Sequence, residues 1–216
     1  MSDAASMNGR DTDGLFVGFV LGTYMWRDRL ATGSSSDALR RGFVTGIPAA
    51  VLVFALTALV RLIEISRSPG GVRLYLRPDG ADGMLSVFAG TFYGAHPGAY
   101  HAPVWLDTVL QRYDTVPDVI YVLIAAAVLL AAGWFAARTA RSESGGVSAI
   151  DSACRGAAVT TGYAPAVVFG ALALDGLIDL GPVSVLLDQT LTIALVAGLV
   201  SPVVAGTIGG LLAMYG

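Results

Sequence analysis

The residues that could line a passage through a membrane lie in two apolar segments that contain proline. Pro165 and Pro202 have no backbone N–H, so each leaves a carbonyl one turn earlier without its usual donor. Transporters use such interrupted helices as ion and substrate sites, but neighbouring hydroxyl groups can also satisfy the freed carbonyls, which would make the prolines purely structural. The predicted pathway residues are Thr160, Thr161, Tyr163, Pro165, Ser201 and Pro202.

Three aspartates follow the first of these segments. Asp175 and Asp179 are one helical turn apart, and Asp188 lies beyond a Gly-Pro turn. They form either a cation-attracting outer vestibule or an ordinary solvated loop. Their spacing defines no cage for a divalent ion, so we predict no metal site here.

The two histidines and the one cysteine are the remaining candidates for chemistry. His96 and His101 flank a proline, and their spacing of five residues does not place them on one helix face. They are pH-sensitive or metal-binding groups, or ordinary interfacial histidines. Cys154 is the only cysteine, which excludes an intramolecular disulfide.

Motifs for phosphate binding, for a nucleophile elbow and for zinc proteases do not occur in the sequence. The predicted spans hold no Asp, Glu or His, and their only Arg is Arg61 at the end of the first. Proton-coupled carriers, voltage sensors and intramembrane hydrolases generally need an ionisable group at depth. We therefore predict that the chain is not an enzyme and has no catalytic residue, cofactor or metal.

The composition indicates that most of this chain lies in a lipid membrane. Apolar residues make up 55% of the sequence and charged residues 13%, and the mean hydropathy is +0.68. The net charge of −3 and the absence of a long run of like charge exclude nucleic acid as a partner. All 13 basic residues are arginine and most acids are aspartate, a bias typical of a GC-rich, salt-adapted source or of codon usage alone.

The apolar pattern predicts an all-α, polytopic membrane bundle of four transmembrane helices. A helix needs about 20 apolar residues to cross a bilayer. Four stretches qualify in a membrane domain at 42–216, after a polar segment at 1–41, and they span 43–61, 119–137, 156–174 and 190–215. Two shorter runs do not. The segment 15–29 is predicted as an amphipathic, interfacial helix, and its apolar part 15–26, like the run 84–95, is interfacial, re-entrant or packed in the bundle.

Arginine placement predicts the orientation. With the N-terminus inside, cytoplasmic segments carry eight arginines and outside segments five, which favours N-in and C-in in the cell membrane.

Small residues on the last span permit close approach of another helix. They are Ala205, Gly206, Gly209 and Gly210. The approaching helix belongs to the same bundle, to a second copy of the chain or to a membrane-protein partner. Two functions follow: transport of a small solute or ion, or, alternatively, a structural or assembly subunit that docks through these faces.

Three segments resemble a family of uncharacterised haloarchaeal membrane proteins. They are Phe92–His96, Gly162–Pro165 and Gly198–Gly206, and the similarity covers 40–215. The resemblance implies an archaeal cell membrane and four spans with an aromatic-His segment between the first two. Where an asparagine is expected in that segment this chain has Gly94. Some relatives are loosely called transporters, but the resemblance brings no activity and no catalytic residues.

Overall fold

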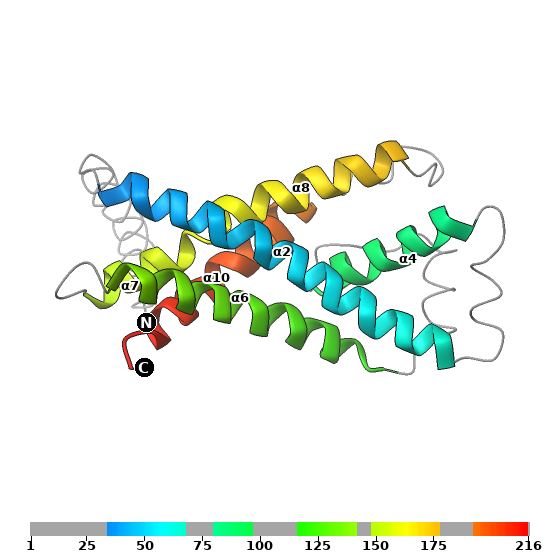
Figure 1. Cartoon of the computed structure of the whole chain (residues 1–216), viewed down its shortest axis with the longest axis horizontal. Helices are drawn as coiled ribbons and strands as arrows, with labels where there is room; N and C mark the ends of the chain where they lie inside the picture. Colours follow the sequence, from blue (N-terminus) through cyan, green and yellow to red (C-terminus); the bar gives the residue numbers. More distant parts are fainter. Residues whose placement is uncertain (1–33, 68–79, 97–115, 142–147, 178–191, 216) are drawn as a thin grey trace, which may run out of the picture. The chain divides into compact units, whose positions relative to one another are not determined.

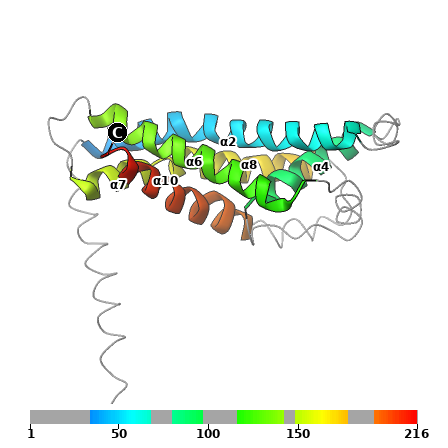
Figure 2. The same ribbon diagram turned by 90° about the horizontal axis from the view of Figure 1, so that it is seen from below.

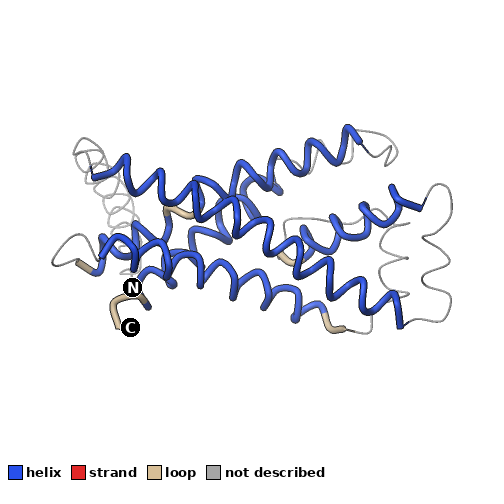
Figure 3. Tube along the Cα trace, viewed as in Figure 1, coloured by secondary structure: helices blue, strands red, loops and turns tan. Residues whose placement is uncertain are grey.

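The computed structural model describes residues 34–67, 80–96, 116–141, 148–177 and 192–215, and within these ranges every regular element is a helix (Figure 3). The predicted all-α fold is therefore confirmed. The chain divides into two compact units, Met1–Ala38 and Leu39–Gly216. Apart from the first turn of the first helix, the described helices all lie in the second unit. The predicted interfacial helix at 15–29 lies outside the described residues.

The described helices of the second unit lie alongside one another as a bundle (Figure 1). In chain order they are α2 (Ser34–Arg67), α4 (Gly80–Gly94), α6 (Asp118–Arg141), α7 (Ala149–Ala157), α8 (Thr160–Leu177), the π-helix η1 (Ile193–Val200) and α10 (Ser201–Leu212). Four stretches are long and apolar enough to cross a membrane: Ser36–Arg67, Asp118–Thr139, Ala149–Ala173 and Leu195–Leu212. These four helices indicate a multi-pass membrane protein.

The first helix is longer than the predicted span 43–61. Its 34 residues give a length of about 51 Å, well beyond the hydrocarbon thickness of about 30 Å. The sequence pattern ends the span at Arg61, with its guanidinium reaching the headgroups. In the structure the helix continues for six more residues, and Arg61 is only 4% exposed. The side chain is thus enclosed by protein instead of extending into the headgroups.

Helix α4 packs inside the bundle. Its 15 residues reach about 22 Å, too short to cross a bilayer. Phe92 contacts Phe54 of α2 with ring centroids 5.7 Å apart, and the Tyr93 hydroxyl donates to the carbonyl of Val167 in α8, 3.0 Å away. Because Phe54 and Val167 lie well inside their own spans, α4 enters from one end and stops within the bundle (Figure 1). This is a re-entrant arrangement.

Glycines set the separation of the long helices. A Cβ on Gly42 of α2 would lie 2.0 Å from the carbonyl oxygen of Ala158, and one on Gly156 of α7 would lie 2.1 Å from that of Gly206 in α10. Such contacts require backbones that touch directly, as small residues allow in membrane bundles. The pair α7 and α8 therefore packs against α2 on one face and against α10 on the other, and Figure 2 shows α2 and α10 on opposite sides of the bundle.

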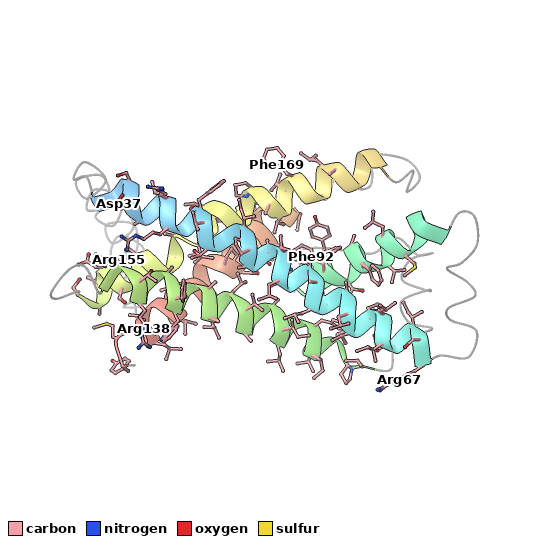
Figure 4. All side chains as sticks on the ribbon, viewed as in Figure 1. Asp37, Arg67, Phe92, Arg138, Arg155 and Phe169 are labelled. Carbon is pink, nitrogen blue, oxygen red and sulfur yellow. The ribbon has the colours of Figure 1, made fainter. Side chains whose placement is uncertain are left out.

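The outward-facing side chains suit lipid. Large apolar residues are exposed along all the long helices, among them Phe169 of α8 at 70%. Arg138 and Arg155 lie at one end of the bundle and Arg67 at the other (Figure 4). This placement of arginines is typical of residues that flank a hydrocarbon layer.

Candidate functional site

Buried charges gather where α2, α4 and α6 meet. We call Arg61, Glu64, Thr91 and Tyr121 the Arg61 cluster. The Arg61 Nη1 lies 3.0 Å from Glu64 Oε2, and Arg61 Nε donates to Thr91 Oγ1 over 3.1 Å. The Tyr121 hydroxyl donates to Glu64 Oε2 in a short hydrogen bond. A buried pair of opposite charges is tolerated only with such additional hydrogen bonds.

Further contacts fix the other groups of the Arg61 cluster. Glu64 Oε1 accepts from the backbone N–H of Val116, just before α6, at 2.6 Å. The Arg61 guanidinium carbon lies 4.9 Å from the centre of the Tyr121 ring, a cation–π contact. The Thr91 hydroxyl in turn donates to the carbonyl of Val87 at 2.8 Å. One ion pair on α2 thus fixes both α4 and the start of α6.

A second polar contact lies at the inner end of α4. His96 Nε2 is 2.8 Å from the Tyr163 hydroxyl of α8, and His96 Nδ1 is 3.0 Å from the carbonyl of Phe92. A carbonyl only accepts, so Nδ1 carries the proton and donates, and in the neutral ring Nε2 accepts from the tyrosine O–H. The contact is enclosed by protein, because His96 is 1% exposed and Tyr163 is fully buried. The neutral ring therefore joins α4 to α8.

The third feature is an interruption between α7 and α8. The N–H of Val159 donates to Gly156 at 3.3 Å, that of Thr161 to Ala158 at 2.9 Å and that of Gly162 to Val159 at 3.2 Å. These bonds span three residues instead of four, so the helix tightens locally. The Thr161 hydroxyl donates to the carbonyl of Ala158 at 2.8 Å and to that of Leu39 in α2 at 3.2 Å. The break is thus held against α2.

The last span is interrupted as well. Residues 193–200 form a π-helix, and the N–H of Ser201 donates to the carbonyl of Val196, five residues earlier. The Ser201 hydroxyl donates to the same carbonyl at 2.9 Å. In this register the next residue would donate to the carbonyl of Ala197, but that residue is Pro202, which has no N–H. Insertions of this kind are frequent at functional sites.

The two interruptions lie opposite each other. An antiparallel register relates α7 and α8 to η1 and α10: Ala164 contacts Gly198, and Gly156 contacts Gly206. Thr160 is midway between 156 and 164, and Pro202 is midway between 198 and 206. Thr160 therefore faces Pro202, and we call Thr160, Ala164, Ala197, Gly198 and Pro202 the Thr160 crossing.

The Thr160 hydroxyl is the distinctive polar group of this crossing. Thr160 is 8% exposed, and within the described part of the chain its Oγ1 has no hydrogen-bond partner. An unsatisfied buried hydroxyl costs about 1 to 3 kcal/mol. Ala197 and Pro202 are fully buried. The crossing thus holds a buried hydroxyl and, at Ala197, a carbonyl whose donor in the π-helical register would be a proline.

The six predicted pathway residues do not form one row. Thr160 and Pro202 meet at the crossing, and Ser201 caps the carbonyl of Val196 beside it. Thr161 faces α2 and Tyr163 faces His96, away from the crossing. Pro165 lies inside α8, partly buried.

The other predicted groups are placed only in part. Asp175 lies in the last turn of α8, whereas Asp179 and Asp188 lie outside the described residues, as does His101. Within the described ranges no group of three His, Cys, Asp or Glu side chains is arranged to hold a metal ion.

The small residues of the last span lie against other helices of the bundle. Gly206 contacts Gly156 of α7 and Gly133 of α6, Gly209 contacts Leu130, and Gly210 contacts Ser152. The Ser152 hydroxyl also donates to the carbonyl of Gly210 at 2.6 Å. Ala205 is partly buried and packs against the core.

The Arg61 cluster is the feature that the sequence analysis missed. Arg61 and Glu64 are three residues apart, a spacing that places them on one helix face and could have indicated an ion pair. The prediction that the first span ends at Arg61 concealed it. Glu64 lies three residues beyond the predicted span 43–61 but within the longer apolar stretch Ser36–Arg67, and it is 2% exposed.

Comparison with known proteins gives one family. The model of a family of unknown function, DUF7978, matches residues 27–216, which is most of the chain and includes all of the described helices. Comparisons with curated proteins and with solved structures find no match. With its family match extending over far more than half of its length, the chain belongs to the DUF7978 family of unknown function.

Proposed function

We propose that this protein transports a small solute or ion across the membrane, through the contact between α8 and the η1–α10 segment. The observation that carries the proposal is the opposition of two helix interruptions at the Thr160 crossing. Backbone that departs from the α-helix inside a bilayer is tolerated where it is enclosed by protein or lines a polar path. Transporters place substrate sites where such interrupted helices meet.

The re-entrant helix supports the same function. Helix α4 brings His96 to the middle of the bundle, beside Tyr163, and the Arg61 cluster fastens its other contacts. A helix that stops inside the bundle adds no crossing of the membrane, so its presence needs another reason. Closing one end of a path between the spans is such a reason.

The alternative role, an assembly subunit, would need an exposed small-residue face. Gly206, Gly209 and Gly210 are buried against α6 and α7, and their faces are occupied within this chain. A second copy or another membrane protein would have to dock on the large apolar side chains instead. These also suit lipid alone, so transport is the better supported of the two roles.

The test is flux into vesicles. The purified full chain is reconstituted into lipid vesicles, and the entry of water, glycerol, urea, Na⁺ and K⁺ is compared with entry into vesicles without protein. We expect at least one of these to cross faster when the protein is present. Equal rates for all five would overturn the transport function and favour the assembly role.

A further inference from the structure

The chemistry of the Thr160 crossing bears on what could pass. A hydroxyl can donate one hydrogen bond and accept up to two, whereas a carbonyl only accepts. A molecule between Thr160 Oγ1 and the carbonyl of Ala197 would therefore need at least one O–H or N–H of its own. Both protein groups are neutral, so they offer no full charge to an ion.

On α6 and η1 the surroundings of the crossing carry no charge. On α6 the facing stretch 123–134 contains only apolar residues, and η1 is likewise apolar throughout. The nearest charged residue on α7 is Arg155, five residues before Thr160, and its Nη1 is buried without a hydrogen bond among the described residues. The Arg61 cluster holds its charges among α2, α4 and α6.

Desolvation decides between an ion and a neutral solute. An ion that leaves water needs either an opposite charge or a full shell of oxygen ligands to replace its hydration. The crossing offers one hydroxyl and one carbonyl among apolar side chains. A neutral molecule loses far less hydration, and two hydrogen bonds replace most of what it loses.

We propose that the Thr160 crossing binds uncharged solutes that carry O–H or N–H groups, such as water, glycerol or urea, with Thr160 Oγ1 and the Ala197 carbonyl as its two hydrogen-bonding groups. This inference rests on the proposed transport function and names its substrate class. It also accounts for the one buried threonine hydroxyl in the described bundle that lacks a partner inside the protein.

The experiment replaces the hydroxyl and keeps the shape. Full-length protein carrying Thr160→Val, Thr160→Ala or Thr160→Ser is reconstituted into vesicles, and entry of water, glycerol and urea is followed by light scattering, with Na⁺ and K⁺ entry measured in parallel. The control is Thr57→Val, because the Thr57 hydroxyl is buried but bonded to the carbonyl of Val53 at 2.8 Å. Gel filtration in detergent confirms that each variant is folded.

The outcomes separate the two proposals. Thr160→Val and Thr160→Ala are expected to lower neutral-solute entry by about threefold to tenfold, the loss of one hydrogen bond, while Thr160→Ser and Thr57→Val retain it. Neutral-solute entry that is unchanged in Thr160→Val overturns the assignment of Thr160, and entry of Na⁺ or K⁺ without neutral solutes overturns the substrate class. Both results leave transport itself standing. If nothing crosses, the transport function fails as well.

Discussion

The Arg61 cluster and the Thr160 crossing are both buried and both polar, but they differ in how their polar atoms are used. In the cluster, both Glu64 oxygens accept hydrogen bonds, and the Thr91 hydroxyl serves Arg61 as well as its own helix. At the crossing, a hydroxyl of similar burial has no partner among the described residues. A carboxylate and a hydroxyl that are bonded within the protein favour a structural role, and a buried hydroxyl without such a bond favours a role that needs an incoming molecule.

The difference also concerns the backbone. Around the Arg61 cluster α2 and α6 run as continuous helices, whereas both helix partners of the crossing are interrupted. Interruptions forfeit regular hydrogen bonds and therefore cost stability. Two helix interruptions that face each other therefore lower the stability of the bundle at that point, which is common at functional sites. The following variants test this contrast.

The largest effect is expected from Glu64→Ala, which removes the carboxylate of the Arg61 cluster. The substitution leaves Arg61 buried without its carboxylate and removes the acceptor for Tyr121 and for the N–H of Val116. Loss of one partner of a buried ion pair costs about 3 to 5 kcal/mol. We expect the free energy of unfolding in detergent, measured by steric trapping, to fall by that amount.

The control is the double variant Arg61→Leu with Glu64→Ala. Removing both charges leaves no unpaired ion, so the double variant should lose less stability than Glu64→Ala alone. A single variant that unfolds no more easily than the double variant would mean that the pair does not hold α4 and α6.

A smaller loss of stability is expected from Gly206→Ala, which tests the close contact between α10 and α7 next to the Thr160 crossing. The new Cβ would lie 2.5 Å from the carbonyl oxygen of Gly156, so α10 must move away from α7. Overpacking of this kind costs about 1 to 3 kcal/mol. The matched control is Gly94→Ala, also a helical glycine, whose Cβ would meet no atom within 4 Å. Thermal unfolding of the two variants should differ clearly, and equal stability would contradict the close approach.

Tyr163→Phe should cost less again. It removes the O–H that His96 Nε2 accepts and leaves that nitrogen without its bond to α8. Hydrogen bonds between helices in a membrane contribute about 1 kcal/mol. The unfolding free energy should fall by this amount, with Tyr215→Phe at the 90% exposed C-terminal tyrosine as the unaffected control. Equal unfolding free energies for the two variants would mean that the contact between His96 and Tyr163 does not stabilise the bundle.

The smallest and opposite effect is expected from Thr160→Val. Replacing an unsatisfied buried hydroxyl by a methyl group removes a desolvation penalty, so stability should stay the same or rise by about 1 kcal/mol. Thr91→Val, at a hydroxyl bonded to both Arg61 and Val87, should instead lower it. If both threonine variants lose stability equally, the Thr160 hydroxyl has a structural partner and the contrast between the two regions is wrong.

The sequence predicts the helical architecture well, because a segment that crosses lipid has to be apolar and has to satisfy its own backbone hydrogen bonds. Long charge-free stretches have to be helices across a bilayer, so four spans and an all-α bundle follow from residue counts alone. The two prolines also mark the segments in which the interruptions occur. The pairing of Thr160 with Pro202 could not be predicted, because it depends on the register between helices about 40 residues apart in the chain.

The Arg61 cluster was missed for a related reason. A charged residue after an apolar run ordinarily marks the end of a span, and the position of a third helix beside it is not encoded in that pattern. Thr91 lies in a run too short to cross, and Tyr121 is one aromatic residue at the start of a strong span. The re-entrant course of α4 brings Thr91 to Arg61, and the packing of α6 beside α2 brings Tyr121 there.

If the Thr160 crossing conducts solutes, water and small solutes reach Thr160, and thiol labelling at this position tests that access. Full-length protein with Cys154→Ser and Thr160→Cys is reconstituted into vesicles and exposed to a small, membrane-impermeant thiol reagent, beside the same protein with Cys154→Ser and Val53→Cys in the core of α2. Labelling at position 160 with protection at 53 is the predicted result. Protection at both positions would show a dry crossing and contradict the account.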